Sequence, residues 1–326
     1  MTLVTADDLA RDIRDFLAFK HALGYSYTRG EATLRSFQRF VQCKLGQHPT
    51  KQPTIALEPT IQNWLSRVED RKAVTIATDL GVVRQLCLYR RRRHPGAFVP
   101  EHAYAPQTES VYSPYIFSHK EVQQLITAAK RHQGRNIWAV MLHLLLLTLY
   151  CTGLRFGEAI RLRLSDVNLK QYQFEIRESK GRSRLVPFGP DLAREINAYL
   201  EERTCIAVAT ECTETDALFI RLDGSPLTVG AASEAVRRLL RNQGLKPAKG
   251  RIGPRPYDFR HAYAVHRLTD WYRQGVDIHA RLPWLSAYMG HVNVLGTEVY
   301  LHATPELLQL ASNRFEQRYR RPGSVR

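Results

Sequence analysis

Apolar residues recur at helical spacing through the N-terminal part of the chain. Between residues 9 and 17 they lie at i, i+4, i+7 and i+8, which places them on one face of a helix. Similar stripes occupy residues 34–45, 61–68 and 76–87. The pattern therefore predicts a four-helix unit at the N-terminus.

Residues 94–114 interrupt this pattern, because they contain four prolines and no apolar period. Such a stretch is typical of a linker between two folded parts. A chain of 326 residues is also long enough for two domains. We therefore expect a helical domain over residues 1–95, a linker over residues 96–114 and a second domain over residues 115–326.

The second part of the chain mixes helical and strand periods. Ser118 and Glu121 form a capping-box pattern, and the apolar run at residues 137–151 is too short for a membrane span, which needs about 20 residues. Alternation at residues 172–176, the turn SKGRS and the stretch RLVPF predict a β-hairpin. Helical spacing returns at residues 192–200, 231–241, 258–273 and 283–289 and in the C-terminal tail. The predicted fold class is mainly α with a small β-hairpin, α+β.

The chain is strongly basic. It carries 47 Lys and Arg against 31 Asp and Glu, a formal net charge of +16. Such an excess favours a polyanionic partner, DNA or RNA, while an anionic membrane is the competing interpretation. Five cysteines without a C-x-x-C pattern, and an N-terminus without the apolar core of a signal peptide, indicate reduced thiols in a cytoplasmic protein.

A run of arginines ends the fourth predicted helix. Such a run is often only a solvated face, but in this basic chain phosphate contact gains weight. The residues are Arg90, Arg91, Arg92 and Arg93.

Three further segments carry residues suited to chemistry. TGLRFGE places Arg155 and Glu158 one helical turn apart, next to the apolar run. YDFRH contains Arg260 inside a helical stripe, and GHVNVLGTEVY contains His291 and Tyr300. A charge this close to a core is costly unless it is paired, which raises the question of what Arg155 binds.

The order of these segments, R-x-x-E, K-G-x-x-R-x-V-P, Y-x-x-R-H and G-H-x8-Y, resembles the tyrosine recombinase family, also called phage integrases. The resemblance covers nearly the whole chain. It implies an N-terminal core-binding, SAM-like helical domain and a catalytic domain that together form a C-shaped clamp on double-stranded DNA. It also implies a site-specific recombinase or integrase that cuts and rejoins DNA without metal, ATP or any other cofactor.

The resemblance assigns a role to each matching residue. Arg155 and Arg260 would clamp the scissile phosphate, which suits guanidinium groups that bind two oxygens and keep their protons. Tyr300 would be the nucleophile that forms a 3′-phosphotyrosyl intermediate. His291 would donate a hydrogen bond to the phosphate, and Lys180 on the hairpin turn would be the general acid.

Other positions are expected to assist. Arg182 and Arg184 flank the same turn and are expected to contact DNA, while Glu158 is expected to orient Arg155. Tyr257 stands where the family most often has histidine. Because tyrosine is a poor base at neutral pH, this departure leaves open how Tyr300 loses its proton.

The expected assembly is a homo-tetramer on paired DNA sites, with or without a related recombinase. The apolar C-terminal tail would dock on a neighbouring protomer, or else fold back on its own domain. Two other functions stay open: a catalytically impaired sequence-specific DNA-binding protein, and a DNA-relaxing enzyme of the type IB topoisomerase kind. The biological outcome, whether integration, excision, transposition of a mobile element or dimer resolution, also stays open, as does the target sequence. The expected location is the cytoplasm, in association with the nucleoid.

Overall fold

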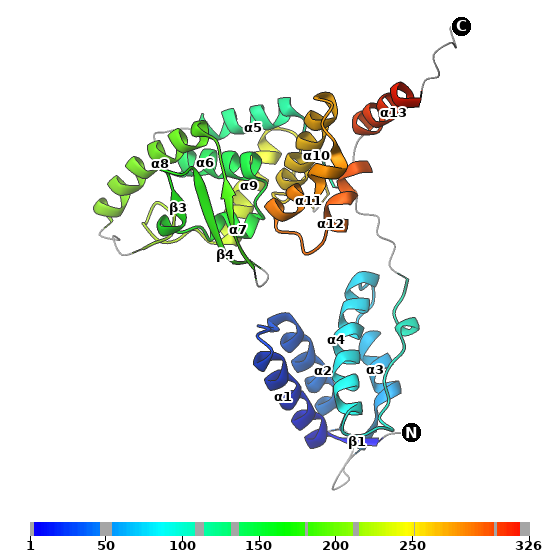
Figure 1. Ribbon diagram of the computed structural model, residues 1–326. Helices are drawn as coiled ribbons and strands as arrows, with labels where there is room; N and C mark the ends of the chain where they lie inside the picture. Colours follow the sequence, from blue (N-terminus) through cyan, green and yellow to red (C-terminus); the bar gives the residue numbers. More distant parts are fainter. Residues whose placement is uncertain are drawn as a thin grey trace. The chain divides into compact units, whose positions relative to one another are not determined.

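The computed structural model describes residues 3–45, 54–107, 114–131, 137–179, 182–210, 215–250, 252–302 and 305–319. The chain divides into two compact units, Met1–Tyr112 and Ser113–Arg326 (Figure 1). Helices dominate both units and strands are few and short. This confirms the expected fold class, mainly α with a small β component.

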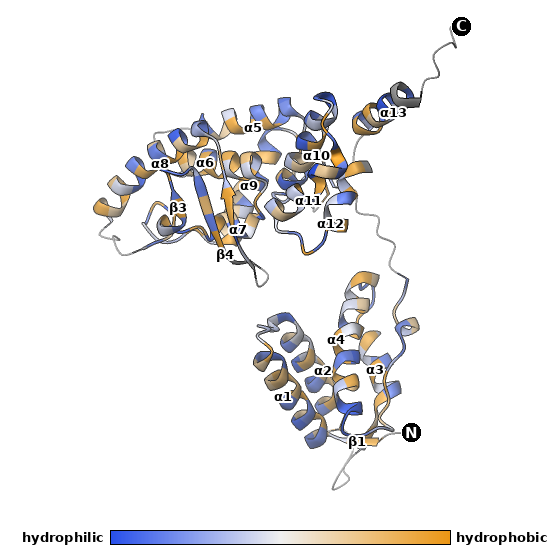
Figure 2. Ribbon diagram, in the orientation of Figure 1, coloured by the Kyte–Doolittle hydropathy of each residue, from blue (hydrophilic) through white to orange (hydrophobic). Residues whose placement is uncertain are grey.

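Four helices make up most of the first unit. Their apolar sides face one core, and the hydropathy colours alternate along each helix accordingly (Figure 2). The predicted third stripe is too long at its end, because the helix stops at Leu65 and Val68 is exposed. The helices are α1 (Ala6–Ala22), α2 (Thr28–Leu45), α3 (Leu57–Leu65) and α4 (Ala73–Arg91).

A two-stranded antiparallel sheet, which the sequence pattern did not predict, closes one end of this unit. Strand β1 (Leu3–Thr5) pairs with β2 (Thr54–Ala56). Strands of three residues are too short to display an alternating period, so only the folded chain brings them together.

The expected linker is partly folded. Ala97 is buried, and Phe98, Val99 and Tyr104 pack against the core of the first unit. The Arg84 Nε atom donates to the carbonyl oxygen of Pro100 at 3.0 Å, and a short 3-10 helix, η1, spans His102–Tyr104. Residues 97–105 therefore extend the first unit, which differs from the expected linker over residues 96–114. Scattered apolar side chains can dock on a helix without any period of their own.

The second unit is built around α6. This helix, Ile137–Thr152, contains the apolar run, and residues from α5, α7, α8, α9 and α10 contact it. Met141, Leu145 and Leu149 are fully buried or nearly so, which confirms the expected core helix. The helices are α5 (His119–Lys130), α6 (Ile137–Thr152), α7 (Phe156–Ile160), η2 (Leu164–Asp166), α8 (Pro190–Ala209), α9 (Val229–Asn242), α10 (Asp258–Arg273), α11 (Ile278–Met289), α12 (Leu295–Glu298), η3 (Val299–His302) and α13 (Pro305–Tyr319).

The predicted local signals in this unit are present. Ser118 caps α5, and its side chain and that of Glu121 exchange hydrogen bonds with each other's backbone, as a capping box requires. The predicted hairpin is formed by β4 (Gln173–Ser179) and β5 (Arg182–Pro187), and a short strand β3 (Val167–Asn168) extends the sheet in the order β3-β4-β5. Within the described ranges, no helix has both the length and the apolar character that crossing a bilayer demands.

The C-terminal helix α13 packs against α10 of its own chain. Leu307 is fully buried there, and the Arg314 guanidinium donates to the carbonyl oxygens of Val276 at 2.6 Å and Gly275 at 2.8 Å. Glu306 adds an ion pair with Arg273. The described part of the tail therefore folds back on its own domain.

Candidate active site

Arg155 is placed by a sharp turn between α6 and α7. Gly153, just after α6, has φ of +59°, a left-handed conformation that glycine adopts at low cost. A Cβ atom at this position would lie 2.3 Å from Cδ1 of Tyr263. The turn thus needs glycine both for its backbone and for space, and it puts Arg155 immediately before α7.

Glu158 holds Arg155 in place from within α7. Its Oε1 accepts from Nη1 of Arg155 at 2.7 Å, and its Oε2 accepts from the Arg155 backbone N–H at 2.9 Å. Only 2% of the Glu158 side chain is exposed. The expected i, i+3 contact is therefore present, and because it is buried, removing either partner would leave a charge out of water.

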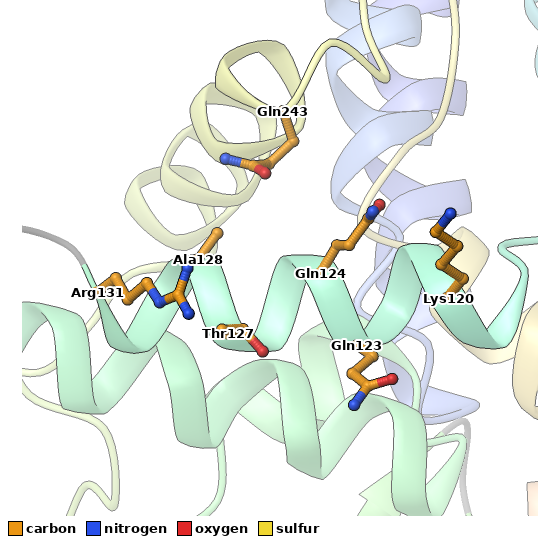
Figure 3. Close-up of a pocket in the computed structure, with 7 residues that line it drawn as sticks. All are labelled: Lys120, Gln123, Gln124, Thr127, Ala128, Arg131 and Gln243. Atoms are coloured by element: carbon orange, nitrogen blue, oxygen red, sulfur yellow. The ribbon is translucent and has the colours of Figure 1, made fainter.

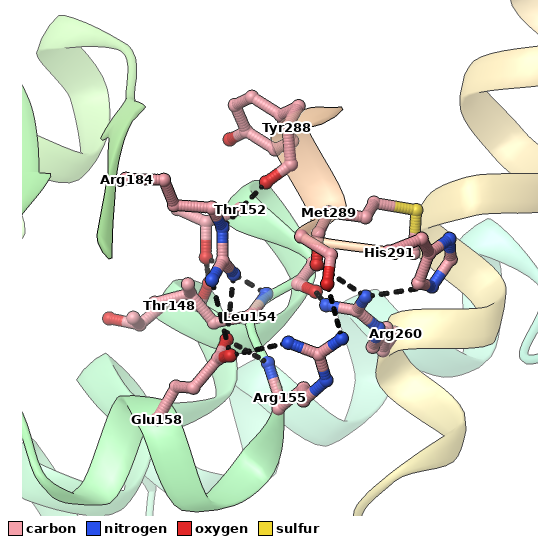
Figure 4. Close-up of polar contacts among 12 residues, drawn as sticks. Thr148, Thr152, Leu154, Arg155, Glu158, Arg184, Arg260, Tyr288, Met289 and His291 are labelled. Atoms are coloured by element: carbon pink, nitrogen blue, oxygen red, sulfur yellow. Dashed lines mark hydrogen bonds and ion pairs between the residues drawn. The ribbon is translucent and has the colours of Figure 1, made fainter. Parts of the chain in front are cut away.

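Arg184 is a second partner of Glu158, which the sequence did not predict. From β5, its Nη2 donates to Oε2 of Glu158 at 2.8 Å and its Nη1 to Oε1 at 3.2 Å (Figure 4). Its Nε donates to the carbonyl oxygen of Tyr288 at 2.9 Å, and only 13% of its side chain is exposed. Arg184 was expected to contact DNA; the structure commits its guanidinium to a buried carboxylate and a carbonyl, because the strand points it inward beside α7.

Arg260 reaches the same place from α10. It is 1% exposed, its Nη1 donates to the carbonyl oxygen of Gly153 at 2.7 Å, and its Nη2 donates to that of Met289 at 2.6 Å. Burial lowers the pKa of Arg260, but a guanidinium stays charged in proteins. Its Nε is buried and has no hydrogen-bond partner among the described residues.

The two arginines meet at the end of α11. Nη2 of Arg155 donates to the carbonyl oxygen of Gly290 at 2.6 Å, one residue after the Met289 carbonyl that Arg260 binds. Gly290 ends α11 with φ of +69°, and a Cβ atom there would lie 2.8 Å from Cζ of Arg184. Carbonyl groups at a helix C-terminus carry partial negative charge, so they attract both cations.

His291 follows directly and is locked in one tautomer. Its Nε2 lies 2.9 Å from Nη2 of Arg260, and its Nδ1 lies 2.6 Å from Oγ1 of Thr297. Because a guanidinium only donates, Nε2 must accept, and Nδ1 carries the proton that it donates to Thr297.

Tyr300 completes the cluster from η3. Its side chain is 3% exposed, and its ring centroid lies 6.3 Å from that of His291 and 5.4 Å from that of His261. Burial raises the pKa of Tyr300 above its ordinary value, while Arg260 and Arg155 act to lower it. Arg155, Arg260 and Tyr300, which are far apart in the sequence, are thus brought together.

Tyr257 lies at the edge of this cluster. It precedes α10, 39% of it is exposed, and its ring centroid lies 5.1 Å from that of His261. His261 itself was not predicted as a site residue. The available signal was its position, one helical turn after Tyr257 and next to Arg260.

The remaining predicted site residues differ in their burial and in how much of each residue the structure describes. Lys180 lies outside the described residues, and of Arg182 only the backbone, paired with Ser179, is described. Arg91, Arg92 and Arg93 are exposed at the end of α4. Arg90 is instead buried in an ion pair with Asp12, with 2.9 Å between Nε and Oδ2, so the expected phosphate contact is wrong for this residue. Successive residues of a helix are rotated by about 100° around its axis, so Arg90 can face the core while Arg91 faces solvent.

A polar hollow on α5 and the end of α9 is separate from this cluster (Figure 3). It is lined by side chains that include Lys120, Arg131 and Gln243, and the arginine and tyrosine residues of the cluster do not line it. The chemistry is therefore concentrated at the meeting point of α7, α10, α11 and η3.

Comparison with known proteins agrees with this arrangement. The phage integrase family matches residues 116–306. The protein y4rB of Sinorhizobium fredii, described as an integrase/recombinase, is 31% identical over 94% of this chain and 96% of its own. Tyrosine recombinase XerC of Staphylococcus epidermidis is 28% identical over 61% of this chain and 60% of its own. Among solved structures, XerH recombinase bound to difH in a post-cleavage complex superposes with a TM-score of 0.65 at 17% identity, covering 96% of this chain and 85% of that one.

The matches define both the class of the protein and its family. The fold is that of solved recombinase structures, and the family match and the relatives define a tyrosine-type site-specific recombinase. The chain belongs to the phage integrase family.

Proposed function

We propose that this recombinase cuts and rejoins double-stranded DNA through a 3′-phosphotyrosyl intermediate formed on Tyr300. The observation that carries the proposal is that three contacts bring Arg155, Arg260 and Tyr300 together. Arg260 binds His291, His291 stacks beside Tyr300, and Arg155 binds Gly290, the residue before His291. Arg155, Arg260 and Tyr300 would then lie around a single phosphodiester.

The two guanidiniums would bind the non-bridging oxygens of the scissile phosphate. Charge develops on these oxygens in the pentacoordinate transition state, and fixed cations stabilise it. The buried Arg260 Nε, which has no hydrogen-bond partner among the described residues, supports this role, because an unpaired buried donor is costly until an acceptor arrives.

The chemical step exchanges one phosphodiester bond for another. The Tyr300 Oη forms a bond to phosphorus, the bond from phosphorus to the 5′-oxygen breaks, Tyr300 loses a proton and the 5′-oxygen gains one. Lys180 is our candidate to supply the second proton. A 5′-hydroxyl then attacks the phosphotyrosyl bond, so rejoining needs no external energy source.

DNA is the partner that the charge favours. The net charge of +16 and the exposed Arg91, Arg92 and Arg93 would neutralise backbone phosphates, so affinity should fall steeply with salt. Several structures of the same fold were solved with DNA, among them the Tn1549 transposon integrase with a circular intermediate. We also propose that the N-terminal unit is a core-binding domain and that the protein acts in the cytoplasm on nucleoid DNA.

We propose a tetramer on paired sites as the active assembly, with four identical protomers or with a related recombinase. Leu308 and Phe315 on α13 are exposed although Leu307 is buried, and Trp284 on α11 is also exposed. These apolar side chains would be covered in an assembly. The molecular mass of the DNA complex, measured by light scattering with and without paired sites, tests the proposal.

The central experiment is trapping on a nicked suicide substrate. The unaltered protein should form a covalent adduct, Tyr300→Phe should form none, and Tyr272→Phe, the matched control on α10, should form it normally. An adduct in Tyr300→Phe would refute the assignment. DNA binding without any adduct in the unaltered protein would favour a catalytically impaired DNA-binding protein, and relaxation of supercoiled DNA without paired sites would favour a topoisomerase.

A further inference from the structure

Attack by Tyr300 requires its phenolic proton to leave. Burial raises the pKa of this phenol above 10, so its ionised fraction at neutral pH is small. The residue at the family's usual histidine position is Tyr257, a poor base. Another group must therefore accept the proton if the proposed reaction is to run near neutrality.

His291 is poorly placed to be that group. Its Nε2 accepts from Arg260 and its Nδ1 donates to Thr297, so both ring nitrogens are engaged. To take a proton it would first have to lose the Arg260 contact, which holds it in the cluster.

His261 lies between the two tyrosines. It follows Arg260 on α10 and stands one helical turn after Tyr257. Its ring centroid is 5.1 Å from that of Tyr257 and 5.4 Å from that of Tyr300. The imidazole therefore packs directly against the nucleophile, in the region that the histidine missing from position 257 would otherwise serve.

The two nitrogens of His261 have different surroundings. Nε2 lies 4.0 Å from Oδ1 of Asp258, a fully buried carboxylate whose Oδ2 accepts from the Arg255 backbone N–H at 2.7 Å. Nδ1 is buried and has no hydrogen-bond partner among the described residues. The nearby carboxylate favours the proton on Nε2, which leaves the lone pair on Nδ1.

The surroundings of His261 favour its neutral form, chiefly through burial. Burial lowers its pKa below 6.5; Asp258 acts to raise the pKa, and Arg255 and Arg260 act to lower it further. Tyr257 and Tyr300 are the other titratable groups beside the ring, and burial raises the pKa of Tyr300, so that phenol is uncharged near pH 7. The imidazole thus has an unprotonated nitrogen at the pH at which the enzyme would work.

We propose that His261 is the proton acceptor for Tyr300, acting directly or through one water molecule, and that Asp258 orients it. The inference rests on the proposed function. As the bond between Tyr300 Oη and phosphorus forms, the phenolic O–H bond breaks and its proton moves to Nδ1 of His261; the bond from phosphorus to the 5′-oxygen breaks at the other side. On rejoining, the imidazolium returns this proton to the departing Tyr300 oxygen.

The test separates the loss of the Tyr300 proton from the protonation of the leaving 5′-oxygen. In a DNA substrate with sulfur in place of the scissile 5′-oxygen, the leaving thiolate needs no proton. Single-turnover formation of the covalent adduct is then measured against pH for the unaltered protein and for His261→Gln. The unaltered protein should level off near or below pH 6.5, where His261 has lost its proton.

The expected defect of His261→Gln at pH 7 is about 10²- to 10⁴-fold, the usual contribution of a general base. Its rate should keep rising with pH, because hydroxide must replace the imidazole, while DNA affinity stays unchanged. Added imidazole should partly restore His261→Ala. A role limited to packing would give neither the altered pH profile nor the rescue.

His279→Gln is the matched control, because it makes the same replacement at an exposed histidine of α11 outside the cluster and should retain the rate within about threefold. Melting temperatures identify misfolded variants, and His261→Asn replaces any that fails to fold. If the unaltered protein forms an adduct and the folded His261 variants match its rate and pH profile, His261 is not the base although the proposed function stands. If the unaltered protein forms no adduct, the proposed function itself fails.

Discussion

Replacing Arg184 distinguishes a residue that binds DNA from one that builds the active site. Arg184→Met keeps most of the side-chain length but removes the hydrogen bonds at 2.8 and 3.2 Å to Glu158 and at 2.9 Å to the Tyr288 carbonyl. Glu158, which is 2% exposed, is then left with Arg155 as its partner in this part of the cluster.

The size of the effect follows from burial. Removing one member of a buried charge pair costs about 3–5 kcal/mol, because the remaining charge stays out of water. At about 2–4 °C per kcal/mol for a domain of this size, the melting temperature of the catalytic unit should fall by roughly 6–20 °C. Arg184→Lys should recover only part of the loss, because an ammonium group cannot bind the carboxylate and the carbonyl as a planar fork does.

Two measurements distinguish a DNA contact from a structural role for Arg184. Thermal unfolding reports the loss of stability, and DNA affinity at several salt concentrations reports phosphate contacts. Each lost contact reduces the slope of log affinity against log salt by about 0.9. Arg91→Ala, at the exposed end of α4, is the matched comparison and should reduce the slope without lowering the melting temperature. If Arg184→Met reduced the slope and melted normally, Arg184 would be a DNA contact and our account of the Glu158 network would be refuted.

Four further substitutions test the packing around the site, in the tail and in the N-terminal unit. Gly153→Ala should destabilise the catalytic unit by about 1–3 kcal/mol in urea titration, since it combines a left-handed backbone with a collision at Tyr263; normal stability would mean that the turn is not tight. Leu307→Ala should cost about 2–5 kcal/mol of local stability and increase hydrogen exchange in α13, whereas Phe315→Ser, at an exposed position, should leave the protomer unchanged and weaken assembly on DNA. Arg90→Met should lower the stability of the N-terminal unit by about 3–5 kcal/mol without affecting the salt slope, and an altered slope would restore its role in DNA contact.

Local sequence patterns accounted for the helices and strands whose apolar residues recur at a regular spacing. The α1–α4 stripes, the α5 capping box, the core helix α6 and the β4–β5 hairpin all follow from spacing and turn residues. The β1–β2 pair and the docked segment at residues 97–105 did not follow, because their partners are distant in the sequence and their own residues show no repeat.

By itself, the sequence determined which residue types the site would contain. The order of its motifs marks the family, and these motifs contain Arg155, Arg260, His291 and Tyr300. Such motifs can be recognised without knowing where their side chains point.

Only the tertiary structure decided how the remaining polar residues are used. Side-chain direction and burial turn Arg184 toward Glu158, Arg90 toward Asp12 and His261 toward Tyr300. The physical reason is that the cost of a buried charge, and the surroundings that set the proton affinity of an imidazole, depend on what packs around them from distant parts of the chain, and spacing along the sequence carries no record of those neighbours.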